Sequence, residues 1–196
     1  MKKLLSLVLS LMILALPLCA AAESGEAFEF VFRNGIKWGD TLSNVHALEL
    51  ADDNLSHKTF KEGNRKILLY LGVDVSEYSA QLEYFFRNDI LYACRYEMFF
   101  SEEKWAYMAG ALSAKYGEPA ATDTENAYGL LEIFGTDETP LILTSALWEM
   151  PDGTAILLYT LEDEFPPLCI AYINTAAPAE PEPTEIPDEE FNLTGL

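Results

Sequence analysis

The sequence predicts an α+β fold, an antiparallel sheet with two main helices packed on one face. Three observations predict it. Apolar, alternating segments are joined by tight turns at Asn88-Asp89 and Pro151-Asp152-Gly153, as in antiparallel hairpins. Two segments show apolar residues three and four apart behind a capping residue, the pattern of surface helices. Half of the residues are hydrophobic, which is enough for a sizeable core in one compact domain.

Residues 1–22 have the pattern of a secretory signal peptide. Lys2 and Lys3 precede an apolar run, and three alanines at 20–22 offer small side chains for cleavage. Pro17 ends the apolar run early, whereas a membrane-spanning helix needs about 20 apolar residues. We therefore expect a secreted or cell-envelope protein with no transmembrane anchor in the mature chain. Cys19 follows Leu18, which is too large for a lipoprotein signal, so lipid anchoring is the minor alternative.

The composition makes the chain strongly acidic. Without Lys2 and Lys3, 10 basic residues stand against 32 acidic ones, a net charge of −22. Such a surface repels nucleic acid and favours solubility and basic partners. The acidic, proline-rich residues 176–196 predict a disordered tail, which leaves residues 23–175 as the single folded domain.

The first structural segment is expected to turn from a strand into a helix. Phe28, Phe30 and Phe32 alternate with polar or smaller residues, and Asn34-Gly35 ends that strand. Trp38 and Gly39 then lead to Asp40 or Thr41, either of which can cap a helix. We assign Trp38, Gly39 and Asp40 a structural role, as the corner that sets this helix on the sheet.

The middle of the chain predicts a strand, a hairpin and a second helix. Residues 65–73 form an apolar run that fits a strand buried on both faces. The hairpin arms are residues 81–87 and 90–100. In its second arm, alternation places five residues on one face: Ile90, Tyr92, Cys94, Tyr96 and Met98. Ser101 caps the helix that follows, and Gly117 with Pro119 ends it.

The last third of the chain predicts further strands. Residues 128–134 fit a short strand, residues 141–150 and 154–161 form a hairpin, and residues 168–173 complete the sheet. The order of helices and strands suggests a tandem helix-plus-meander repeat.

Cys94 and Cys169 each lie in an apolar strand-like run. One disulfide between them is one alternative, and two buried free thiols are the other. Sequence spacing does not decide between the two, because a disulfide needs neighbouring strands with suitably directed side chains.

Candidates for catalysis are few. The two histidines, His46 and His57, could hold a metal with Glu49 and Asp53, because imidazole and carboxylate are suitable ligands. One helical face with a histidine and two acids is common by chance, so we assign no metal, no cofactor and no catalytic residue. The sequence contains no nucleophile elbow, zinc-protease, phosphate-loop or dinucleotide motif.

Three short motifs resemble the small exported proteins grouped around the β-lactamase inhibitory protein and the SmpA/OmlA lipoproteins. They are Lys37-Trp38-Gly39-Asp40-Thr41 running into Val45 and Leu48, residues 82–86 followed by 90–92, and residues 115–119. The resemblance implies units of a helix plus a short antiparallel sheet, and a role in binding or assembly rather than catalysis.

The leading hypothesis is an exported, non-enzymatic binding module for an unknown protein or envelope component. The contacts are expected at the two hairpin tips, at Asn88, Asp89, Asp152 and Gly153. The alternatives are a small envelope hydrolase or metal-dependent enzyme that uses His46 and His57, and a purely structural surface protein.

Overall fold

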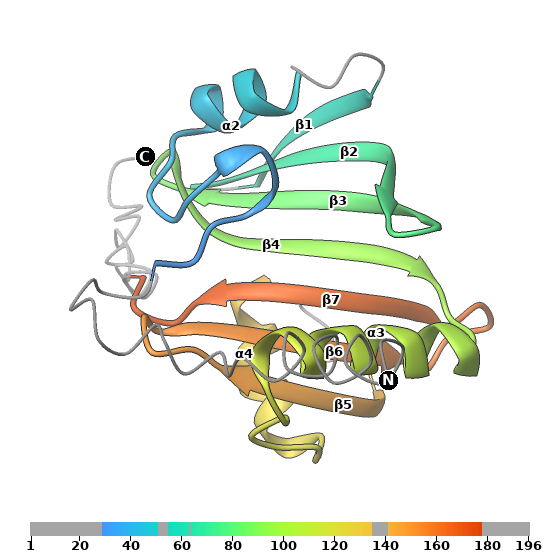
Figure 1. Cartoon of the computed structure of the whole chain (residues 1–196). Helices are drawn as coiled ribbons and strands as arrows, with labels where there is room; N and C mark the ends of the chain where they lie inside the picture. The colour runs from blue at the N-terminus through green and yellow to red at the C-terminus, as the bar shows by residue number, and fades with distance from the viewer. Residues whose placement is uncertain (1–28, 51–54, 63, 135–140, 178–196) are drawn as a thin grey trace, which may run out of the picture.

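The computed structural model describes residues 29–50, 55–62, 64–134 and 141–177. Within these residues the chain forms one seven-stranded antiparallel sheet with helices on both faces (Figure 1). The α+β prediction, with an antiparallel sheet and two main helices on one face, is therefore confirmed. The predicted signal peptide and most of the predicted tail lie outside the described residues, and the structure does not establish a tandem repeat.

The strands follow the order β1-β2-β3-β4-β7-β6-β5, and every neighbouring pair is antiparallel. Their bounds are β1 Ser56–Glu62, β2 Arg65–Val75, β3 Tyr78–Arg87, β4 Ile90–Phe99, β5 Ile142–Glu149, β6 Thr154–Leu161 and β7 Pro167–Asn174. The first four strands form a meander, and the last three form another. The pairing of β4 with β7 joins the two meanders into one sheet.

Helices α2 (Leu42–Glu49) and α3 (Glu102–Tyr116) cover the same face of the sheet. Val45 of α2 packs on β2 and β3, whereas Met108 and Leu112 of α3 pack on β5, β6 and β7. As predicted, Ser101 caps α3, with its hydroxyl accepting from the Lys104 N–H, and Gly117 has a positive φ of 88° where the helix ends. The cap of α2 is Thr41, whose side chain accepts from the Asn44 N–H.

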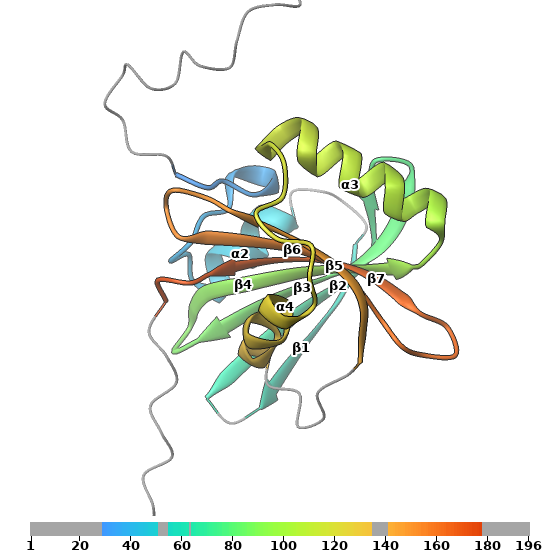
Figure 2. The same ribbon diagram turned by 90° about the horizontal axis from the view of Figure 1, so that it is seen from below.

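Helix α4 (Glu125–Leu131) and a 3₁₀ turn η3 (Glu132–Phe134) lie on the opposite face (Figure 2). The predicted strand at residues 128–134 is therefore wrong. Apolar residues in a short run fit a buried helix as well as a strand, and here Ala127, Leu131 and Phe134 pack on Leu157 and Ala171. Phe134 also meets Phe85 of β3 edge-on, with the ring centroids 4.7 Å apart.

Two further expectations need correction. Residues 29–32 do not form a regular strand, because Val31 makes only an isolated antiparallel bridge with Lys37. The turn predicted at Asn34-Gly35 is present as a 3₁₀ turn η2 (Arg33–Gly35), in which both residues have positive φ. Strand β2 is buried on one face only, because Leu68 and Tyr70 are buried while Leu71 is 37% exposed. Strand β1, which the polar sequence of residues 51–63 did not predict, forms one edge of the sheet.

No helix among the described residues is long and apolar enough to cross a membrane.

Candidate functional site

The β3–β4 hairpin forms one wall of a groove at one end of the sheet. Its two-residue turn has positive φ at both Asn88 (51°) and Asp89 (69°), as in a type I′ turn. A β-bulge then interrupts the ladder, because Phe85 pairs with Ala93 whereas Phe86 pairs with Leu91. Tyr92 is the extra residue. The bulge turns its side chain to the face that carries α4, where it packs with Ala93 in the core.

The Trp38-Gly39 step forms the second wall. The backbone N–H of Gly39 donates to the Leu91 carbonyl (3.3 Å), and the Leu91 N–H donates to the Asp40 carbonyl (2.9 Å). Gly39 has a φ of 88°, a conformation that side chains rarely adopt. These two hydrogen bonds fasten the chain before α2 to the first residues of β4.

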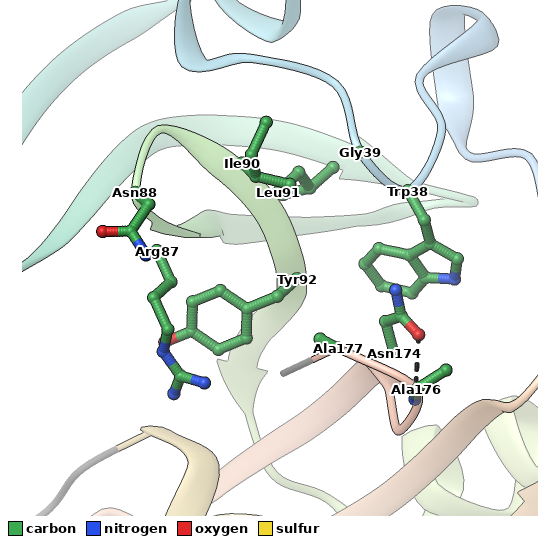
Figure 3. A pocket seen from close by; sticks show the side chains of 10 residues that line it. All are labelled: Trp38, Gly39, Arg87, Asn88, Ile90, Leu91, Tyr92, Asn174, Ala176 and Ala177. Carbon is green, nitrogen blue, oxygen red and sulfur yellow. Dashed lines mark hydrogen bonds between the residues drawn. The ribbon is translucent and has the colours of Figure 1, made fainter. Parts of the chain in front are cut away.

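The end of β7 and the residues that follow it close the groove. Asn174, Ala176 and Ala177 line it, and the Asn174 side chain accepts a hydrogen bond from the Ala176 N–H (3.1 Å). Figure 3 shows these residues facing Trp38 and Tyr92 across the opening. The pocket bounded by these three walls has a volume of about 440 Å³.

A second pocket of about 410 Å³ adjoins the first and shares Arg87, Asn174 and Ala177 with it. Its far side is made by α4 and η3, through Leu130 and Ile133. We call the two pockets together the hairpin groove. Each has a size typical of small-ligand sites, and the lining combines apolar and aromatic groups with a few polar ones.

Arg87 stands where the two pockets meet. Its guanidinium carbon lies 4.6 Å from the centroid of the Tyr92 ring, a cation–π geometry visible in Figure 3. The Tyr92 hydroxyl donates to the Ile133 carbonyl at 3.3 Å, which ties η3 to β4 behind the ring. The groove therefore presents the planar Arg87 guanidinium, stacked on the buried Tyr92 ring, beside the half-exposed Ile90.

The predicted binding residues separate in the structure. Asn88 lines the groove, but the Asp89 carboxylate lies 3.0 Å from the Lys66 ammonium. At the other hairpin, Asp152 accepts from the backbone N–H groups of Phe30 (2.8 Å) and Thr154 (3.0 Å). Gly153 has a φ of 82° and accepts from Thr175. The structure thus gives Asp152 and Gly153 contacts that hold the fold together.

The metal candidates also separate. The rings of His46 and His57 lie 4.5 Å apart, but Glu49 points into the core. Its carboxylate accepts from the Tyr84 hydroxyl (2.5 Å) and the Asn34 amide (3.3 Å), and it pairs with the Arg33 guanidinium (3.3 Å). Asp53 lies outside the described residues. Within the described part of the chain, no three histidine, cysteine or acidic side chains are grouped to hold a metal.

His46 joins the same polar layer, whereas His57 is exposed beside it. His46 Nδ1 lies 2.8 Å from the Tyr70 hydroxyl, and burial, together with the nearby Glu49 charge, raises the pKa of Tyr70 to about 12. Burial, and then the neighbouring Cys94 and Glu49, raise the pKa of Tyr84 far above its usual range. Both phenols are therefore neutral hydrogen-bonding groups in the folded protein at ordinary pH.

Cys94 and Cys169 are free thiols, and both are fully buried. Their strands are neighbours, but Cys169 pairs with Glu97, which is three residues from Cys94. Because side chains alternate along a strand, this odd separation puts the two thiols on opposite faces of the sheet. The disulfide alternative is therefore not realised. Burial raises the pKa of Cys169 to about 12, so this thiol stays protonated.

Comparison of the chain with protein-family models, with curated proteins and with solved structures gives no match. The likeness to the β-lactamase inhibitory protein and to the SmpA/OmlA lipoproteins therefore stays a prediction from three short motifs.

Proposed function

We propose that the protein is a non-enzymatic binding module that acts outside the cytoplasm, and that it holds its partner in the hairpin groove. The observation that carries this proposal is the meeting of two pockets at Arg87, over the buried ring of Tyr92. The residues described as lining the first pocket include no cysteine, histidine, serine or carboxylate. They can bind a ligand, and the described lining of the second pocket adds one carboxylate, Glu132, with no imidazole or thiol beside it.

The lining indicates the chemistry of the ligand. Ile90 is 43% exposed and, with Leu91 and Trp38, offers an apolar contact. The Arg87 guanidinium and the amides of Asn88 and Asn174 offer hydrogen-bond donors around it. A group that combines an aromatic or aliphatic part with an anionic or carbonyl oxygen fits this arrangement.

A fluorescent probe of matching chemistry, 1-anilinonaphthalene-8-sulfonate, tests the groove. The folded protein is expected to bind it, and Ile90→Asp is expected to weaken binding at least about tenfold, because the carboxylate would oppose both the apolar ring and the sulfonate. Phe165→Asp is the matched control, since Phe165 is 69% exposed in the β6–β7 connection and lines a separate pocket beside Phe99, so it reports any probe bound outside the groove. Equal loss in both variants, or no loss in Ile90→Asp, would count against a binding groove.

The biological partner is sought with the same pair of variants. Envelope and medium fractions are passed over the immobilised wild-type chain, Ile90→Asp and Phe165→Asp. We expect a saturable partner that the wild type and Phe165→Asp retain and Ile90→Asp does not. Cell fractionation with N-terminal sequencing tests export, and a chain that keeps residues 1–22 in the cytoplasm would overturn that part of the proposal.

A further inference from the structure

Strand β1 forms an edge of the sheet and buries almost none of its own side chains. All the side chains of residues 56–61 are exposed, and Phe60 is 48% exposed. The strand is fixed by its seven-residue register with β2, and no described segment pairs with its outer side. An edge of this kind presents a row of backbone N–H and C=O groups to any added strand (Figure 1).

The sheet face beside this edge is apolar and partly open. Phe60 pairs with Ile67, so both side chains lie on one face, and Leu69 and Leu71 follow on the same face of β2. Helix α4 covers this face over the other half of the sheet (Figure 2). Ile67 and Leu69 are half-buried, and Leu71 is 37% exposed. An added strand could therefore bury apolar side chains next to Phe60.

The charge at this edge is opposite to that of the whole chain. Residues 58–66 contain four of the 12 basic residues, Lys58, Lys61, Arg65 and Lys66, and a single acid, in a chain of net charge −20. Lysines on an edge strand repel an identical edge and so disfavour pairing with a second copy of β1. The same lysines attract an acidic strand.

We propose that β1 binds residues 188–194 of the same chain as an added antiparallel strand. Their sequence is Asp-Glu-Glu-Phe-Asn-Leu-Thr, which contains three acids and no proline. Phe191 and Leu193 alternate with Asn192 and Thr194, so a strand here would direct its two apolar side chains to one face, beside Phe60. This is strand addition at a sheet edge, with main-chain bonds for affinity and side chains for specificity.

The segment can reach this edge. Ala177, the last described residue, lines the same pocket as Arg87, and Arg87 pairs with Arg65, which in turn pairs with Glu62. The chain therefore leaves the described fold at the end of the sheet where β1 ends, and a segment entering there runs antiparallel to β1. Ala177 follows β7, and from β7 to the outer side of β1 are five strand spacings, about 24 Å. Residues 178–187 span up to about 33 Å when extended.

Hydrogen–deuterium exchange on the full chain tests the proposal. Phe191→Asp with Leu193→Asp in one chain is expected to speed exchange of β1 amides at least about tenfold, because the added strand loses its apolar contacts. Asn192→Asp with Thr194→Asp is the matched control. It adds the same two charges on the opposite side of the segment and is expected to leave exchange within about threefold of the wild type.

A second variant tests reach without changing the segment. Deletion of residues 178–183 leaves four linking residues, about 13 Å at most, and is expected to act like the Phe191/Leu193 variant. All these changes lie outside the described residues, and the thermal melting of the sheet shows whether the fold is intact.

Three results would overturn the proposal. They are β1 exchange unchanged by the Phe191/Leu193 variant, equal acceleration in the Asn192/Thr194 control, and protection of β1 that rises with protein concentration. The last result would assign the occupant to a second copy.

Discussion

Replacement of Glu49 by glutamine is expected to destabilise the fold strongly, although Glu49 is on the surface helix α2. The carboxylate is fully buried and is held by Tyr84, Asn34 and Arg33 at 2.5 to 3.3 Å. Glutamine keeps the shape but removes the charge that faces the Arg33 guanidinium. Breaking a buried ion pair costs about 3–5 kcal/mol when the other charge remains. The Arg33 side chain is 23% exposed, so water can reach it, and we expect the lower end, about 3 kcal/mol.

The assay is urea and thermal unfolding followed by circular dichroism. For a domain of this size a loss of about 3 kcal/mol lowers Tm by roughly 6–12 °C. The matched control is Glu29→Gln, which breaks the Lys37–Glu29 pair, whose side chains are 46% and 62% exposed. Such an exposed pair contributes at most about 1 kcal/mol. If Glu49→Gln changes stability no more than the control does, the buried pair does not hold α2 on the sheet.

A combined replacement of both charges separates two explanations of that loss. Arg33→Met with Glu49→Leu removes the pair together and fills the space with apolar groups of similar size. Such exchanges of a buried pair are often close to neutral, although here Tyr84 and Asn34 also lose their acceptor. We expect a loss smaller than in Glu49→Gln. A larger loss would mean that the stability lost in Glu49→Gln comes mainly from the hydrogen bonds of Glu49 and not from the Arg33 charge that has lost its carboxylate.

Three more outcomes follow from the structure. Gly39→Ala is expected to lower the free energy of unfolding in urea by about 1–2 kcal/mol, because Gly39 has a φ of 88°. Gly110→Ala, within α3 and with open space around it, should raise that free energy by about 0.5–1 kcal/mol. If both substitutions change it in the same direction, the backbone conformation assigned to Gly39 is contradicted. Folded Tyr70 keeps its proton to about pH 12 while the unfolded chain releases it near pH 10, so the contribution of Tyr70 to the free energy of unfolding should be intact below pH 10 and fall by at most about 3 kcal/mol towards pH 12. Tyr84, whose pKa is raised further, makes the total fall larger, so the contribution of Tyr70 is measured as the difference between the wild type and Tyr70→Phe in urea unfolding; a difference that does not change with pH would refute this. Cys94 and Cys169 should react with a thiol reagent once the chain is denatured, even when no reductant has been added, and should not react in the folded protein. If a reductant increases the number of reactive thiols in the denatured chain, the two cysteines form a disulfide.

Local sequence signals were sufficient to predict turns and helix ends, where a single residue type determines the backbone conformation. The turn at Asn88-Asp89, the cap at Ser101 and the helix end at Gly117 were predicted and are present, because each depends on the conformational preference of a residue in place. Strand β1 was missed for the opposite reason. The side chains of residues 56–61 are all exposed, so the sequence carries no hydrophobic period there, and only the ladder to β2 makes the segment a strand.

The groove could be predicted only in part. Simple alternation put Tyr92 on the face of Cys94 and Met98, but the bulge opposite Phe85 and Phe86 moves it to the other face. No residue type in this hairpin marks that extra position. Asn88 could be identified from its turn, whereas Arg87, Ile90 and Asn174 become a site only because β7 lies beside β4. That pairing joins segments about 80 residues apart and leaves no local trace.

The two proposed binding surfaces, the hairpin groove and the β1 edge, are connected by the chain that leaves Ala177. Variants in each surface can therefore test whether the two are coupled. Ala177 lines both pockets of the groove and is also the last described residue before the segment proposed to pair with β1. If that segment crosses towards β1, its first residues start from the groove, so a groove ligand and the added strand should influence each other's affinity reciprocally. Ile90→Asp should then weaken ligand binding while leaving exchange of β1 unchanged, because Ile90 lines the groove and lies on β4, three strands away from β1. The Phe191/Leu193 variant should free β1 and alter ligand affinity only if the two sites are coupled.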